Sequence, residues 1–99
     1  MNPIDFTNIR VATVLEEVAA EREKQRAKWG DDHDDGHDGG ELAEAAAFLA
    51  SHDGTMRDPP DWAYALDANN PPRRRYIIAA ALLVAEVERL DRLTERESE

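Results

Sequence analysis

The chain has 99 residues, a length that allows one small domain with a single hydrophobic core. Hydrophobic residues make up 41% and charged residues 34%, a balance typical of folded globular proteins and not of disordered or membrane-spanning chains. The 22 acidic and 12 basic side chains give a formal net charge of -10, which argues against general binding to nucleic acid polymers because their phosphates would be repelled.

Cysteine is absent from the sequence, which excludes disulfides and cysteine-bound zinc. Any metal would be held by carboxylates, histidines or backbone oxygens, and such ligands favour hard cations. The first ten residues, MNPIDFTNIR, lack the basic start and apolar run of a signal peptide, and no apolar stretch approaches the roughly 20 residues that span a bilayer. We therefore expect a cytoplasmic protein that does not interact with membranes.

The first predicted helix covers residues 7–29, which contain neither proline nor glycine. Thr7 or Asn8 can cap its start, and Gly30 ends it because glycine readily adopts the left-handed conformation found after helices. Apolar residues at helical spacing predict a buried stripe made of Val11, Val14, Leu15 and Val18. Residues 30–40, GDDHDDGHDGG, have no helical or strand periodicity and predict a loop.

Two further helices are predicted after this loop. Residues 41–52 are rich in alanine and form the shorter one, which Gly54 would close, whereas residues 73–97 follow a pair of prolines and extend for about 36 Å. A short helix is expected at 61–66 in the connection between them. We predict an all-α fold, a helical bundle of two long helices and one shorter helix in a single domain over residues 1–99.

The helix predicted over residues 73–97 carries more apolar surface than one neighbouring helix can cover. Its first half is apolar around most of its circumference, through Tyr76, Ile77, Ile78, Leu82, Leu83 and Val84. We expect a second copy of the chain to cover the excess, so that oligomerisation, at least to a homodimer, completes the bundle.

Acidic residues on inward helical faces are the candidates for metal binding. Glu41 and Glu44 lie three residues apart and project from one face, so they can bind one cation together, although acids near a helix start are also stabilised by the helix dipole. On the helix predicted over residues 73–97, Glu86 falls on the apolar side, whereas Glu88 points nearly opposite. That apolar side comprises Ala79, Leu83, Val87, Leu90 and Leu93.

A buried Glu86 needs a partner, because an unpaired carboxylate inside a protein costs several kcal/mol. Arg22 could provide a structural salt bridge, and a metal ion shared with Glu41 and Glu44 is the interpretation that we prefer. On the first helix, Glu21, Arg22, Gln25 and Trp29 continue the apolar stripe, either because the helix end emerges into solvent or because they line a cavity.

The acidic loop has two possible roles. Asp31, His33 and Asp35 are spaced like the start of an EF-hand, but Leu42 would then occupy its twelfth position, which excludes calcium binding of that kind. His33 and His37 could bind a transition metal or belong to a solvated turn.

Three sequence strings, AEREKQRAKWG, HDDGHDGGELAEAA and RRRYIIAAALLVAEVERLDR, together resemble the small phage-type members of the MazG-like all-α nucleoside triphosphate pyrophosphohydrolase superfamily. The resemblance covers roughly residues 17–93. That superfamily has an E-x-x-E pair and a later E-x-x-D pair, both binding Mg²⁺. Glu41 and Glu44 match the first pair; for the second, Glu88 and Asp91 fit the spacing whereas helical phase favours Glu86, and both options stay open.

The resemblance implies hydrolysis of a ribo- or deoxyribonucleoside triphosphate to the monophosphate and pyrophosphate. Mg²⁺ or Mn²⁺ held by Glu41, Glu44 and Glu86 would activate a water molecule, and Glu21 could take its proton. Arg22, Lys24, Gln25, Lys28 and Arg74, within the cluster 73–75, would contact the substrate, and Trp29 or Trp62 would stack on the base. Residues 73–75 could equally be a solvated helix start.

Two other classes of function compete with this interpretation. A non-catalytic acidic interaction protein, such as one that imitates DNA phosphates, would also have a strong negative charge. A simple oligomerisation module could use its acidic residues for solubility alone.

Overall fold

The computed structural model describes residues 8–36, 40–51 and 60–98, and in these ranges the chain is helical without a strand. The helices are α1 (Ile9–Asp35), α2 (Glu41–Ala50), α3 (Asp61–Asn69) and α4 (Pro72–Glu97). The all-α prediction is confirmed, and the predicted starts of α2 and α4 agree with the observed ones to within one residue. Gly54, the expected end of the second helix, lies outside the described residues. None of the described helices combines the length and the apolar character that a membrane-spanning helix requires.

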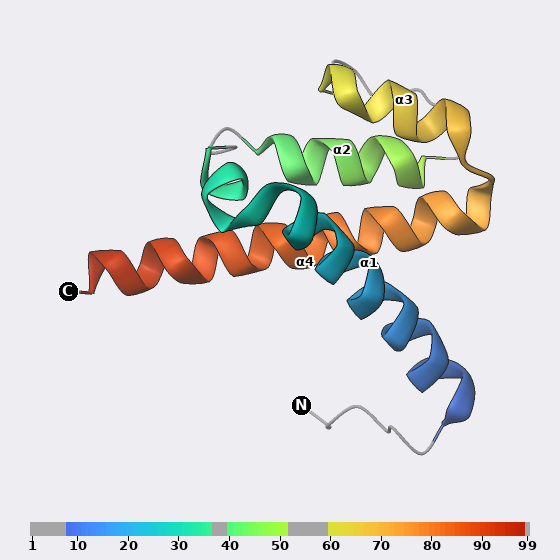
Figure 1. Cartoon of the computed structure of the whole chain (residues 1–99), viewed down its shortest axis with the longest axis horizontal. Helices are drawn as coiled ribbons and strands as arrows, with labels where there is room; N and C mark the ends of the chain where they lie inside the picture. The colour runs from blue at the N-terminus through green and yellow to red at the C-terminus, as the bar shows by residue number, and fades with distance from the viewer. Residues whose placement is uncertain (1–7, 37–39, 52–59, 99) are drawn as a thin grey trace.

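Helix α4 contacts both α1 and α2 along its length (Figure 1). α2 lies along α4, α3 packs on α2, and α1 crosses α4 with its N-terminal half extending away from the rest of the molecule. Small alanine side chains allow α2 and α4 to approach closely. The main core comprises Leu42, Ala45, Ala46, Phe48, Leu49, Ala63, Ile78, Ala79, Leu82 and Ala85.

Helix α1 is interrupted at Gly30, as the sequence predicts, but it then continues. Gly30 has φ 77° and ψ 172°, a conformation that interrupts the helix and changes its direction. Helical structure resumes and runs to Asp35. The prediction of a loop over residues 30–40 is therefore wrong for the first part of that segment, because an ion pair of Asp34 with Arg22 holds the extra turn in place.

The predicted buried stripe on α1 is wrong for its first three members. Val18 is buried, whereas Val11, Val14 and Leu15 are between 37% and 41% exposed. All three belong to the N-terminal half of α1, and that half extends away from the rest of the molecule (Figure 1). Their helical spacing marks an apolar face, but none of the residues that the structure describes buries that face.

The predicted inward face of α4 also differs from the observed one. Glu86 is buried as expected, but Leu83, Val87 and Leu90 are 46% to 57% exposed and Leu93 is exposed as well. The face that packs inward carries Ile78, Ala79, Leu82, Ala85, Glu86 and Arg89. Helix α4 has two apolar faces, and α2 packs on the one with the smaller side chains because it permits the closer approach.

Candidate functional site

A pocket of about 200 Å³ opens where α1, the end of α3 and the start of α4 meet. Its α1 residues recur at the three- and four-residue spacing that places side chains on one helical face. The lining residues are Glu21, Lys24, Gln25, Lys28, Trp29, Leu66, Asn70, Arg74 and Ile78. The structure thus brings together the predicted proton acceptor Glu21 and all the predicted substrate contacts except Arg22.

The pocket is cationic although the protein is strongly acidic. Among the described lining residues, Lys24, Lys28 and Arg74 contribute three positive charges, against one negative charge from Glu21. The Glu21 carboxylate accepts a hydrogen bond from Arg74 and lies 3.9 Å from Lys24 Nζ. Because the basic groups outnumber the acid, an anion that enters the pocket meets a favourable local potential.

Trp29 provides a flat aromatic surface at the edge of this pocket. Its side chain is 40% exposed, and Lys28 Nζ lies 4.7 Å from the ring centroid, within range of a cation–π interaction. The other tryptophan proposed for stacking, Trp62, instead packs against the main core. Trp29 is therefore the tryptophan that the structure makes accessible beside the cationic residues.

Gln25 is the buried amide of the pocket. It is only 7% exposed, and its Oε1 has no hydrogen-bond partner among the described residues. A buried acceptor without a donor destabilises the folded protein, because it has lost its hydrogen bond to water. Such a group in a pocket wall is suited to a ligand that carries a donor.

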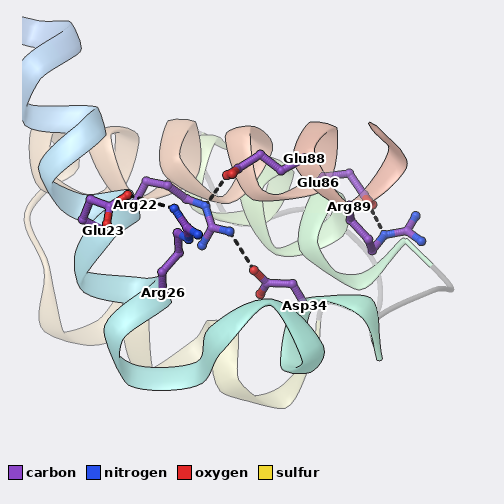
Figure 2. Close-up of polar contacts among 7 residues, drawn as sticks. All are labelled: Arg22, Glu23, Arg26, Asp34, Glu86, Glu88 and Arg89. Carbon is purple, nitrogen blue, oxygen red and sulfur yellow. Dashed lines mark hydrogen bonds and ion pairs between the residues drawn. The ribbon is translucent and has the colours of Figure 1, made fainter. Parts of the chain in front are cut away.

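Arg22 lies outside the pocket and connects parts of the fold. Its Nη2 is 2.9 Å from Asp34 Oδ2, and its Nε is 2.6 Å from Glu88 Oε1 (Figure 2). Glu88 therefore points toward α1, and the expectation that it lies nearly opposite the packed side of its helix is wrong. Nor does Arg22 pair with Glu86, which accepts a hydrogen bond from Arg89 Nε (Figure 2).

The carboxylates predicted to bind metal do not form a shared cluster. Glu41 and Glu44 are half-buried in the first turn of α2, whereas Glu86 is buried on α4 beside Arg89. Asp91, the alternative with Glu88, is exposed. Among the side chains that the structure describes, which do not include those of Asp31, Asp32, His33, Asp35 and Asp67, no group of three or more His, Asp and Glu is arranged to hold a metal ion. The His33 side chain and His37 lie outside what the structure describes.

The basic cluster 73–75 divides between two roles. Arg74 lines the pocket, but Arg73 donates two hydrogen bonds to Glu17 on α1, from Nη1 to Oε2 at 2.8 Å and from Nη2 to Oε1 at 2.7 Å. These hydrogen bonds lower the pKa of the Glu17 carboxyl and raise the pKa of Arg73. Arg73 thus links α1 to α4 at the surface.

Sequence reasoning missed the residues that complete the pocket from α3 and α4. Leu66, Asn70 and Ile78 line it. Asn70 Nδ2 also donates to the Leu66 carbonyl at 2.9 Å, where α3 ends. The Asn-Pro-Pro sequence signals that end, but only the packing of α3 brings it next to α1.

The chain matches no protein-family model, no curated protein and no solved structure at a significant level of similarity. Three cations, an accessible indole ring and an unpaired buried amide oxygen can together receive an anion that carries an aromatic ring with polar edges.

Proposed function

We propose that the protein is a metal-dependent nucleoside triphosphate pyrophosphohydrolase, which converts a ribo- or deoxyribonucleoside triphosphate to the monophosphate and pyrophosphate. The observation that carries this proposal is the pocket in which Lys24, Lys28 and Arg74 adjoin the exposed ring of Trp29. The sequence motifs around residues 20–30, 33–46 and 73–92 support the same class of reaction.

A nucleotide has the two chemical parts that this pocket suits. Its phosphates would bind the two lysines and the Arg74 guanidinium, whose planar donors match phosphate oxygens. Its base would stack on Trp29 in place of the Lys28 ammonium, a contact worth about 1–3 kcal/mol for one base on one aromatic ring. Smaller inorganic anions would make only the contacts with Lys24, Lys28 and Arg74.

Glu21 is the group that we assign to proton transfer. In the free protein its carboxylate is held by Arg74 and Lys24. When phosphate oxygens engage these cations, the carboxylate becomes available to a water molecule. The water oxygen bonds to the α-phosphorus, its proton passes to Glu21, and the bond from the α-phosphorus to the bridging oxygen breaks as pyrophosphate leaves.

Mg²⁺ or Mn²⁺ is the proposed cofactor, with Glu41 and Glu44 offering two hard oxygen ligands from one helical turn. The third proposed ligand, Glu86, does not join them in a single chain because it is bound to Arg89. The described residues of one chain thus do not fit a complete three-carboxylate site, and the proton transfer is assigned to Glu21.

A second copy of the chain is proposed to complete the bundle. The exposed apolar face of α4, formed by Leu83, Val84, Val87 and Leu90, adjoins that of α1, formed by Val11, Val14 and Leu15. A groove of about 340 Å³ between the helices is lined by Leu15, Val18, Ala19 and Val84, with charged residues beside them. None of the described residues lines both this groove and the cationic pocket, so association through the groove would leave the pocket open.

Pyrophosphate release tests the proposed activity. Purified protein is incubated with each common ribo- and deoxyribonucleoside triphosphate and Mg²⁺ or Mn²⁺, and we expect release from at least one of them. Glu21→Gln should lose turnover, whereas Glu16→Gln, an exposed change on the same helix, should retain it. Release from none of the nucleotides would contradict the proposal and favour a non-catalytic acidic interaction protein.

A further inference from the structure

We infer that Gln25 selects the nucleobase, by accepting a hydrogen bond at Oε1 from the exocyclic amino group of adenine or cytosine. This inference rests on the proposed function, because it takes a nucleotide to be the ligand of the pocket. It adds a substrate class: amino bases in preference to the keto bases guanine, uracil and thymine.

The burial of Gln25 supports a role in ligand recognition. The residue lines the pocket, is 7% exposed, and has an Oε1 without a hydrogen-bond partner in the described parts of the chain. A rotation about its terminal side-chain bonds, whose energy minima are broad, would turn this oxygen toward a ligand. A donor from the ligand would then supply the hydrogen bond that the folded protein lacks.

The position of Gln25 directs it to the base and not to the phosphates. It precedes Trp29 by four residues on α1, so the two side chains are neighbours on one helical face. A base that stacks on the Trp29 ring therefore has an edge within one helical turn of Gln25. The phosphates would lie with the cationic side chains Lys24 and Arg74, which carry donors and no acceptor.

Two other polar groups among the described lining residues are engaged. Glu21 accepts from Arg74, and the Asn70 amide donates to the Leu66 carbonyl. Gln25 Oε1 is left as the buried acceptor that needs a donor. Adenine and cytosine present an amino group at the edge where guanine, uracil and thymine present a carbonyl oxygen. A carbonyl there would face Oε1 acceptor to acceptor, which is unfavourable.

Binding of four triphosphates to the intact protein tests the inference. Dissociation constants for ATP, CTP, GTP and UTP are measured by calorimetry with wild-type protein and Gln25→Met, which keeps the length of the side chain and removes its acceptor. We expect ATP and CTP to bind about tenfold more tightly than GTP and UTP, the effect of one well-formed hydrogen bond. Gln25→Met should abolish this difference by weakening ATP and CTP.

The thermal stability of Gln25→Met is the control for folding, and its Tm should equal or exceed that of the wild type because the unpaired oxygen is gone. Equal affinity for all four nucleotides, or a preference for GTP and UTP, would overturn the inference and leave the proposed function intact. An unchanged preference in Gln25→Met would do the same. If none of the four triphosphates binds, both the inference about Gln25 and the proposed function are overturned. If Gln25→Met does not fold, the order of the four dissociation constants in the wild type tests the inference by itself.

Discussion

Arg22 and Asp34 form a buried ion pair across the interruption in α1, with Arg22 Nη2 2.9 Å from Asp34 Oδ2 (Figure 2). The same guanidinium donates from Nε to Glu88 on α4. The Arg22 side chain therefore connects the two parts of α1 to each other and to α4. The pocket residues between positions 21 and 29 lie within the segment that this contact fixes.

Replacing Arg22 by Met should destabilise the fold by about 3–5 kcal/mol, because Asp34 would remain as a buried carboxylate without its cation. Chemical denaturation measures this loss. The matched change Arg26→Met breaks an exposed ion pair with Glu23 at 3.2 Å and should cost at most about 1 kcal/mol. Similar losses in the two variants would show that the burial of Arg22 is not decisive.

Gly30→Ala should cost about 1–3 kcal/mol, the range for a residue held in a backbone conformation that side chains disfavour. A Cβ at this position would meet no atom within 4 Å, so the loss would come from backbone strain and not from a steric clash. Gly40→Ala is the comparison, since Gly40 has φ 89° and ψ 14° in the less restricted left-handed helical region, where the penalty is about 1–2 kcal/mol. If Gly30→Ala leaves the free energy of unfolding unchanged, residue 30 does not hold the backbone conformation that interrupts α1.

The Glu17 and Arg73 contact should make stability depend on pH in the acidic range. The hydrogen bonds from Arg73 hold the pKa of Glu17 below its ordinary value, so the unfolded chain binds its proton first as the pH falls. The stabilisation is complete above the ordinary carboxyl pKa and is lost on acidification through the lowered value. Glu17→Gln should therefore be less stable than wild type near pH 7, and the gap should narrow toward pH 3. A gap of equal size at both pH values would contradict this assignment.

Val87→Glu should convert an oligomer into monomers, because it places a charge in the centre of the exposed apolar face of α4. Sedimentation velocity of the wild type and the variant at micromolar concentration measures the change. Arg96→Glu, an exposed substitution near the end of the same helix and on the side opposite Val87, should leave the association intact. A monomeric wild type would contradict the proposed dimer directly.

Local signals were sufficient for most of the helices and for one side of the pocket. Pro72 marks the start of α4 because its ring fixes φ at a helical value. Gly40 marks the start of α2 because glycine tolerates the positive φ found there. Helical periodicity alone puts Glu21, Gln25 and Lys28 on one face, and these residues line the pocket.

Long-range packing limited what the sequence could predict. Helix α4 has two apolar faces, and its pattern does not say which one α2 will cover. The ion-pair partners of Glu86 and Arg22 could not be predicted either, because several oppositely charged residues lie at spacings that allow a contact. Arg89 is in reach of Glu86 on the same helix, and Asp34 reaches Arg22 only because α1 continues beyond Gly30.

Fluorescence of Trp29 gives the most direct test that the cationic pocket binds a nucleoside triphosphate. In a Trp62→Phe background Trp29 is the remaining tryptophan, and titration with ATP, CTP, GTP or UTP should change its emission to saturation for at least one nucleotide. Lys24→Glu should weaken this binding at least tenfold, whereas Arg10→Glu, the same charge reversal outside the pocket, should have a much smaller effect. An emission that does not respond to any triphosphate, or equal weakening by the two charge reversals, would contradict the nucleotide site.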